Sequence, residues 1–320
     1  RCMTLSRLAK LAHVSVSTAS KAFSMSREVN EQTRQMIFAV ARQEGCFKQF
    51  FSARYPRFVV AILCPELDSL YYSGLVTALH RELTARDCDI CTAVTDFSAD
   101  TLAQRIAYYD AYAAVDGILL IGHEAHPLPP HETPLVAIGS RREDAVASAA
   151  VDFTAAVRAA VAHLCAGGVT DIGFIGEPLT RSKQAAFVAA MEEVVGGAEP
   201  RRIVVSDRRF EPGGYRAAQQ LLEGGQLPGA LLCAYDRLAF GALRCLTERG
   251  LAVPGDVRLM GMDNLAVDAY TVPSLSSIGV DNEALAQWAV SRMLAALTGS
   301  AAPGDLPPEP QLYLRESSAF

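Results

Sequence analysis

The hydrophobic positions of this chain follow two patterns, and the change from one to the other falls near residue 58. Over 4–12, 15–23 and 30–45, apolar residues recur every three or four positions, which predicts three short amphipathic helices. From Phe58 onward, short runs that are apolar almost throughout alternate with helical patterns. Such runs are typical of strands that are buried on both faces of a parallel sheet. The chain is therefore predicted to have a small all-α head and an α/β body.

The predicted body contains two similar rounds of alternating strands and helices. The strands of the first round cover 58–67, 88–94, 115–122 and 134–140, with helices over 71–86 and 101–113. The helices of the second round cover 153–166, 180–195, 213–223 and 236–250, with strands over 171–178, 201–206, 229–235 and 257–263. This order predicts two doubly wound subdomains with parallel sheets. Neither of the glycine-rich phosphate-binding motifs occurs in the expected context, so the sequence does not support a nucleotide-phosphate site.

The first two helices of the head predict a helix-turn-helix. The small side chains of Ala9 and Ala19 let two short helices cross closely. The positions of the second helix outside its core-facing side are Val16, Ser17, Ser20 and Lys21. Such a helix can enter the major groove of DNA, where short polar side chains and a lysine reach base edges or phosphates. A helical hairpin with a solvated basic face is the alternative interpretation.

The charge of the chain is divided unevenly. Residues 1–57 hold ten Lys and Arg against three Glu, a net charge of +7, whereas the rest holds 19 Lys and Arg against 32 Asp and Glu, a net charge of −13. A basic head on an acidic body is expected if only the head contacts a polyanion such as DNA.

The head also carries a recognisable motif. The segments TLSRLAKLAHVSVSTASKAFS at 4–24 and VNEQTRQMIFAVARQEG at 29–45 resemble the helix-turn-helix head of the LacI/GalR repressor family. The resemblance implies two sets of contacts to DNA. The base-reading set is Val16, Ser17 and Lys21. The phosphate-contacting set is Thr18 and Ser20, with further backbone contacts by Thr4, Ser15, Asn30 and Arg34.

The linker behind the head departs from the family's pattern. There the segment commonly reads G-Y-x-P-N-x-x-A-x-x-L and forms a hinge helix whose leucine enters the minor groove and kinks the duplex. Here it reads GCFKQFFSARYP over 45–56, without that proline, asparagine or leucine. One interpretation is a modified wedge, in which Tyr55 at the leucine position or a phenylalanine intercalates. The other, which the departures favour, is that the aromatic residues pack on the head or across a dimer axis. The phenylalanines concerned are Phe47, Phe50 and Phe51.

The body resembles the sensor domain of the same family, whose fold is shared with periplasmic sugar-binding proteins. The matching segments include VDGILLIG, IGFIGEP and AYDRLAFGALRCLTERGLAVPGDVRLMGMDN. The resemblance implies that the chain crosses between two subdomains near 152, 280 and 305, and that a small effector binds and closes the cleft between them. The predicted parts are a head at 1–46, a hinge or linker at 47–57, and an effector-binding and dimerisation domain at 58–320. Within that domain, the N-subdomain covers 58–151 and 281–304, and the C-subdomain covers 152–280 and 305–320.

Asp263 is the first candidate for contact with an effector. It follows an apolar strand in the segment GMDN, and α/β sheets bind ligands beyond the carboxyl ends of their strands. A carboxylate there can accept two sugar hydroxyls, although it can also cap the following helix. Lys183, in SKQAAF, stands where relatives usually have an arginine that holds the effector. Lysine keeps the charge but loses the two-pronged contact, so a surface role is the alternative.

Five other side chains are implied effector contacts by their places in the family's fold. Tyr235 replaces an asparagine of the relatives, and its bulk would reshape the pocket. Phe210 is a candidate stacking surface for a pyranose ring, with packing in the core as the alternative. The remaining three, at the start of the first body helix and the mouth of the cleft, are Asp68, Tyr71 and Tyr72.

Together these observations predict a sequence-specific DNA-binding transcriptional regulator, interpreted as a repressor. A homodimer would read a near-palindromic operator in double-stranded DNA, because the two-fold axis of the protein must match that of the site. A small-molecule effector, interpreted as a sugar or sugar derivative, would change operator affinity by shifting the closure of the sensor. A protein coregulator in place of the sugar is an alternative that the residues leave open.

Other classes of protein have less support. The chain has neither an apolar run of about 18–20 residues nor a signal peptide, which predicts a cytoplasmic protein without a membrane segment and disfavours a transport solute-binding protein. No G-x-S-x-G or metal-binding spacing organises the histidines, so no catalytic residues and no enzyme activity are predicted. Cys88 and Cys91 fall on opposite faces of a predicted strand and are interpreted as buried thiols, not metal ligands. No cofactor or metal is predicted.

Overall fold

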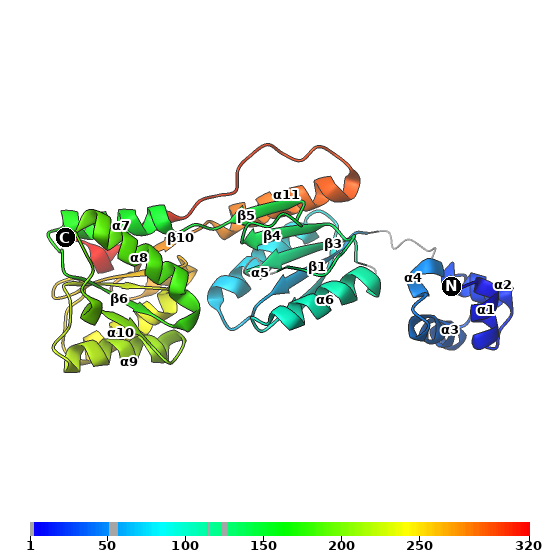
Figure 1. Cartoon of the computed structure of the whole chain (residues 1–320), viewed down its shortest axis with the longest axis horizontal. Helices are drawn as coiled ribbons and strands as arrows, with labels where there is room; N and C mark the ends of the chain where they lie inside the picture. Colours follow the sequence, from blue (N-terminus) through cyan, green and yellow to red (C-terminus); the bar gives the residue numbers. More distant parts are fainter. Residues whose placement is uncertain (1–2, 51–56, 114, 123–126) are drawn as a thin grey trace. The chain divides into compact units, whose positions relative to one another are not determined.

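The computed structural model describes residues 3–50, 57–113, 115–122 and 127–320 (Figure 1). The chain divides into two compact units, one of Arg1–Ala150 with Ala286–Asp305 and the other of Val151–Leu285 with Leu306–Phe320. The first unit includes the predicted head and the first α/β round, and the second unit includes the second round.

The head consists of α1 Leu5–Leu11, α2 Val16–Phe23, α3 Glu31–Gln43 and the short α4 Phe47–Phe50. Ala9 and Ala19 are almost completely buried, so α1 and α2 approach through small side chains. The buried core of the head contains Leu8, Ala22, Phe23, Ile37, Phe38 and Ala41. The three predicted amphipathic helices are therefore confirmed.

The sheet of the first unit has the strand order β2-β1-β3-β4-β5, and all of its strand pairs are parallel. Its strands are β1 Val59–Cys64, β2 Asp89–Val94, β3 Gly117–Ile121, β4 Leu135–Gly139 and β5 Ala147–Ala150. The helices are α5 Leu70–Thr84, α6 Ala99–Ala111 and α11 Asn282–Thr298. Figure 1 shows α6 and α11 on opposite sides of this sheet.

Alternate residues of β3 explain how helices cover both of its faces. Ile118 and Leu120 belong to a buried cluster with Ile106 of α6. Gly117 turns toward the other face, where an added Cβ would lie 2.3 Å from Sδ of Met293 in α11. The missing side chain at this position therefore lets α11 lie close to the sheet.

The sheet of the second unit has the order β11-β10-β9-β8-β6-β7, with β10 and β11 as its antiparallel pair. Its strands are β6 Ile172–Gly176, β7 Ile203–Val205, β8 Ala230–Cys233, β9 Arg258–Met262, β10 Ser276–Gly279 and β11 Gln311–Tyr313. Its α-helices are α7 Thr154–Ala166, α8 Arg181–Val194, α9 Phe210–Glu223 and α10 Asp236–Glu248. Four 3₁₀ turns cover Pro178–Thr180, Pro200–Arg202, Ala266–Tyr270 and Glu316–Ser318. Figure 1 shows α7 and α8 on one side of the sheet and α9 and α10 on the other.

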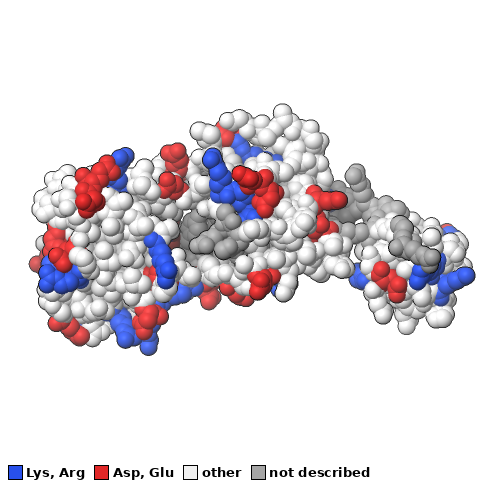
Figure 2. All heavy atoms as spheres, viewed as in Figure 1, with Lys and Arg blue, Asp and Glu red and all other residues white. Residues whose placement is uncertain are grey.

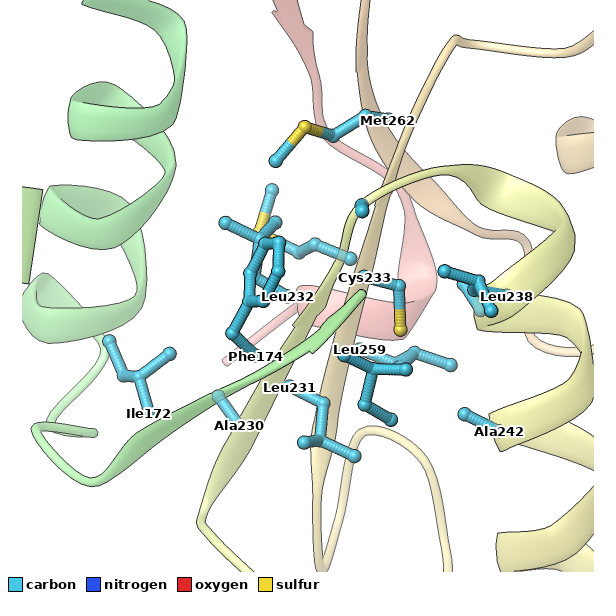
Figure 3. Close-up of a cluster of buried hydrophobic side chains, with 14 of the residues drawn as sticks. Ile172, Phe174, Ala230, Leu231, Leu232, Cys233, Leu238, Ala242, Leu259 and Met262 are labelled. Atoms are coloured by element: carbon cyan, nitrogen blue, oxygen red, sulfur yellow. The ribbon is translucent and has the colours of Figure 1, made fainter. Parts of the chain in front are cut away.

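The core of the second unit joins the strands to α10, as Figure 3 shows. Leu238 and Ala242 of α10 face Cys233 and Leu259 of the strands, and all four side chains are fully buried. Burial of such apolar side chains stabilises the fold by about 1.5–3 kcal/mol for each large one. This packing fixes α10 and the carboxyl ends of β8 and β9 against one another.

Two glycines bring α9 and α10 into backbone contact. A Cβ on Gly214 would lie 1.8 Å from the carbonyl oxygen of Leu238, and a Cβ on Gly241 would lie 1.9 Å from that of Glu211. Any side chain at either position would therefore force the two helices apart.

The predicted fold class, a helical head followed by two parallel-sheet α/β subdomains, is confirmed. The pattern of apolar residues did not predict β5, β10, β11 or α11. The strands among them have only three or four residues, too few for an alternating pattern to emerge. β11 runs antiparallel to β10 after the chain has passed through the first unit over Ala286–Asp305 and entered the second unit again at Leu306. The local sequence pattern does not predict this path.

Candidate membrane spans and metal-binding clusters are both lacking in the part of the chain that the structure describes. No helix in that part of the chain is long and apolar enough to cross a membrane. No group of three or more His, Cys, Asp or Glu side chains in it is arranged to hold a metal ion. Cys88 and Cys91 are free thiols; Cys88 is buried, as expected, whereas Cys91 is only partly buried.

Candidate nucleic-acid interface and effector site

The side of α2 that points away from the head core is open to solvent. Val16 is 46 % exposed, Ser17 and Ser20 are exposed, and Lys21 is half-buried, whereas Ala19 on the opposite side is fully buried. The prediction that these four side chains face outward is confirmed. Figure 2 shows Lys and Arg side chains on the visible face of the head, together with acidic ones.

Three of the predicted DNA contacts cap the helices of the head. The hydroxyl of Thr4 accepts the N–H of Arg7 at 3.3 Å, and the hydroxyl of Ser15 accepts the N–H of Thr18 at 2.9 Å. The side-chain oxygen of Asn30 accepts the N–H of Thr33 at 2.8 Å. Each cap satisfies one backbone donor at a helix start, where the remaining N–H groups favour an anion. These contacts explain the residue types by folding alone, so phosphate binding by the three side chains stays a prediction.

The guanidinium of Arg34 makes its contacts inside the head. The residue is only 9 % exposed, and its Nη2 donates to the carbonyl oxygens of Ser26 at 2.8 Å and Val29 at 2.9 Å. Its Nη1 donates to Glu31 at 2.6 Å. The guanidinium thus holds the loop between α2 and α3, and this placement counts against the predicted contact to the DNA backbone.

Lys21 forms an ion pair within the head. Its Nζ donates to a carboxylate oxygen of Glu28, which lies in the loop that Arg34 holds. The sequence pattern did not predict this pair, because the two residues are seven positions apart and belong to different elements.

Two aromatic residues of the predicted linker pack on the head. The ring centroids of Phe47 lie 5.9 Å from Phe23 and 5.0 Å from Phe38, and the ring of Phe50 lies 5.7 Å from that of Phe23. The guanidinium of Arg42 lies 4.6 Å from the centroid of Phe47. Packing on the head, one of the two interpretations, is confirmed for Phe47 and Phe50. Two other candidates of this segment, Phe51 and Tyr55, lie outside the described residues.

Four of the predicted effector contacts lie close together in the second unit. Nζ of Lys183 donates to Oδ1 of Asp263 at 3.2 Å and to the carbonyl oxygen of Ala234 at 2.8 Å. Ala234 directly precedes Tyr235, whose hydroxyl accepts the N–H of Phe210 at 2.9 Å. Segments from α8, α9, β8 and β9 are therefore joined at the carboxyl ends of the strands, where an α/β sheet binds ligands.

The Lys183–Asp263 pair is largely withdrawn from water. The Asp263 side chain is 11 % exposed, and burial raises the pKa of its carboxyl while the Lys183 ammonium lowers it. Nζ of Lys183 also lies 4.7 Å from the ring centroid of Phe153. Asp263 has φ of +114°, a left-handed value that side chains rarely adopt, and its N–H donates to Ile278 at 2.6 Å. The neighbouring strand thus holds Asp263 in this turn.

The surroundings of Phe210 disfavour one of its predicted roles. The guanidinium of Arg237 lies 3.9 Å from its ring centroid and that of Arg209 lies 4.5 Å from it. Its ring also meets Tyr235 edge-on at 5.9 Å, and burial raises the pKa of Tyr235 to about 12. The Phe210 ring is therefore already in contact with two guanidinium groups, which favours its alternative role in packing.

The predicted contacts in the first unit form a separate aromatic group. The rings of Tyr71 and Tyr72 lie 5.3 Å apart, and that of Tyr72 lies 6.1 Å from Phe97. Tyr72 covers Gly122 after β3, where an added Cβ would lie 2.6 Å from Cε1 of the tyrosine. Asp68 lies just before these tyrosines, at the start of α5.

The site also contains a buried carboxylate that sequence reasoning missed. Glu177 is 3 % exposed, accepts the N–H of Leu179 at 2.9 Å and lies 3.5 Å from Nε of Arg209. Its position directly after β6, like that of Asp263 after β9, is the signal that could have identified it.

Two further carboxyl groups are buried near Asp263. Asp236 accepts the hydroxyl of Ser277 at 2.6 Å and the N–H of Leu265 at 3.0 Å. Asp268 is also fully buried, and Nη1 of Arg315 lies 3.8 Å from its Oδ2. Burial raises the pKa of Asp236 well above its usual value and raises the pKa of Asp268 to about 6.

Comparisons with known proteins agree with this arrangement. Residues 161–318 match a family model described as a periplasmic binding protein-like domain. The HTH-type transcriptional repressor PurR of Escherichia coli is 28 % identical over 342 residues, which cover 99 % of this chain and 97 % of PurR. A LacI-family transcriptional regulator from Sanguibacter keddieii has a TM-score of 0.68 and 26 % identity, over 82 % of this chain and 98 % of the other. The chain belongs to the LacI/GalR family.

The fold of this LacI/GalR protein extends over the whole length of a solved relative. This relative is the lac repressor, in a structure of its dimer bound to operator and an anti-inducer. The superposition covers 100 % of both chains, with a TM-score of 0.68 and 21 % identity. The predicted family is confirmed, and the chain is a DNA-binding transcriptional regulator. The relatives are regulators of transcription, which favours the expectation that this chain is not an enzyme.

Proposed function

We propose that this LacI/GalR regulator is a homodimeric repressor that binds a near-palindromic operator in double-stranded DNA. The observation that carries the proposal is the exposed outer side of α2, supported by capped and closely packed helices. Val16, Ser17 and Lys21 would read base edges in the major groove, while Thr18 and Ser20 contact phosphates. Two heads related by a two-fold axis would require two half-sites in opposite orientation.

The effector is proposed to be a sugar or sugar derivative held against Lys183 and Asp263. The carboxylate accepts hydrogen bonds and the ammonium donates them, and the two atoms lie 3.2 Å apart, so neighbouring hydroxyls can bridge them. The arginines over Phe210 make that ring a poorer place for the sugar. The further proposed contacts are Tyr235 in the C-subdomain and Asp68, Tyr71 and Tyr72 in the N-subdomain.

The proposed domains support these two roles. They are a head at 1–46, a linker at 47–57 whose α4 lies on the head, and a sensor at 58–320. The sensor is divided into 58–151 with 281–304, and 152–280 with 305–320. Effector binding would act by stabilising one closure of the sensor over another.

Selection of DNA from a randomised duplex pool by the full-length protein tests the DNA-binding role. We expect a two-fold symmetric consensus with half-site centres about 10 base pairs apart or a multiple of that, and footprinting protection of the same bases. Failure to enrich any sequence at low salt, with and without candidate sugars, would contradict the proposal.

Thermal unfolding in the presence of sugars, sugar phosphates, uronates and nucleobases tests the effector class. A ligand at 100 times its dissociation constant stabilises the folded protein by about 2.7 kcal/mol, which raises the melting temperature measurably. The response should disappear in the Asp263→Asn variant. A response to nucleobases alone would exclude a sugar, and no response to any compound would favour a protein coregulator.

A further inference from the structure

The loop between α2 and α3 is held in place by one buried side chain. Nη2 of Arg34 donates to the carbonyl oxygens of both Ser26 and Val29, and the Val29 side chain is buried in the head core. Glu28 lies between these two anchored residues, and its own N–H donates to the Ser26 hydroxyl at 3.3 Å. The backbone of Glu28 is therefore fixed on both sides.

The fixed loop presents its carboxylate to the lysine of α2. The Lys21 and Glu28 side chains are 43 % and 68 % exposed, and their ion pair joins the last turn of α2 to the loop. An exposed pair contributes little to stability, so its importance lies in where it holds the ammonium group. Lysine is a flexible point charge with three donors, and one donor directed at Glu28 leaves two for another partner.

We propose that Glu28 is a specificity-determining residue, which holds the Lys21 ammonium toward base edges and away from phosphates, and that Arg34 is the positioning residue for Glu28. The proposal rests on the base-reading role of α2 proposed above. The carboxylate offsets the attraction of Lys21 for phosphates, which is the source of non-specific binding. Guanine acceptors in the major groove still meet the two remaining donors.

Glu28→Gln in the full-length protein tests the proposal, because it removes the charge but keeps the shape. Binding is measured by fluorescence anisotropy on the operator obtained by selection and on a scrambled duplex, over 50–200 mM KCl. Lys21, freed from Glu28, should gain one phosphate contact on the scrambled duplex. The slope of log affinity against log salt concentration then steepens by about 0.9. Over this range of KCl, the affinity of the variant for the scrambled duplex should fall about 3.5-fold more than that of the wild type. Operator affinity should change less, so the ratio of operator to scrambled binding falls.

Glu44→Gln is the matched control, since Glu44 is an exposed glutamate of the same head at the end of α3. It makes the same change in net charge without touching Lys21. The effect of Glu28→Gln should exceed that of Glu44→Gln, and in a Lys21→Gln background the two should become equal. Equal effects of the two variants in the wild-type background would overturn the proposal.

Arg34→Lys provides a second measurement, because lysine keeps the charge but cannot hold two carbonyls as a fork. The variant should reduce base preference in the same direction as Glu28→Gln, and the double variant should add nothing further. If the effects of Arg34→Lys and Glu28→Gln on base preference add up in the double variant, Arg34 does not act through Glu28. A wild-type protein that selects no operator would instead refute the proposed function, so the two failures are distinguishable.

Discussion

The buried carboxyl pair of the second unit predicts how its stability depends on pH. Asp268 is fully buried, with Arg315 at 3.8 Å and with Asp263 as a negative neighbour. Because burial raises the folded-state pKa of Asp268 to about 6, the folded chain retains a proton that the unfolded chain has lost. Stability from this group is complete below the unfolded pKa of about 3.9 and is lost as the pH rises through about 6.

The size of this effect follows from the two pKa values. The difference between about 6 and about 3.9 corresponds to about 3 kcal/mol at 1.36 kcal/mol per pKa unit. Asp268→Asn removes the titrating carboxyl and puts a neutral amide of similar shape in its place. The variant should therefore exceed the wild type by up to about 3 kcal/mol at pH 8 and be nearly equal to it at pH 4.

Hydrogen–deuterium exchange of peptides from β9 and β10 measures this free energy in the second unit alone, after correction for the pH dependence of chemical exchange. Glu309→Gln is the control, because it removes an exposed carboxylate from the same unit. A constant difference between wild type and Asp268→Asn from pH 4 to pH 8 would refute the reasoning. So would an equal pH-dependent gain in Glu309→Gln.

Three further predictions concern the head and the helix contact. Lys21→Ala should weaken operator binding by about 1–3 kcal/mol and relax the preference at one base pair; an equal loss across operator variants would assign Lys21 to phosphates instead. Phe47→Ala removes a ring that contacts Phe23 and should lower head stability by about 2 kcal/mol, measured by thermal melting of its NMR signals. Gly241→Ala should lower stability by about 3 kcal/mol, because its Cβ would lie 1.9 Å from a carbonyl oxygen of α9. Gly304→Ala, whose Cβ would meet nothing within 4 Å, is the control, and equal melting temperatures for these two variants would contradict the close contact.

The sequence predicted those parts of the fold that repeat a local pattern. Strands such as Val59–Cys64 are apolar throughout because both faces of the sheet are covered, and the head helices bury one side at regular intervals. The strand Gln311–Tyr313 has neither property, since it is short and pairs with a strand distant in sequence. Its place depends on the return of the chain, not on its own residues.

The candidate sites were predictable to a smaller extent. The position of Asp263 after a strand predicted its place at the carboxyl edge of the sheet, whereas Lys183 was a candidate only through the family resemblance. The contact between the two at 3.2 Å comes from the structure. The partners of Arg34 were not predictable, since carbonyl groups carry no signature in the sequence. The arginines over Phe210 were missed because one of them comes from another helix.

The aromatic contacts of α4 also determine where the head can be cut from the sensor when a chimeric repressor is made. A head cut after residue 46 and joined to a foreign sensor would leave Phe23 and Phe38 without the rings of Phe47 and Phe50. The smallest head that keeps these aromatic contacts therefore ends after Phe50, four residues beyond the buried Cys46. Chimeric repressors made from this chain should keep that aromatic segment with the head and place the join behind it.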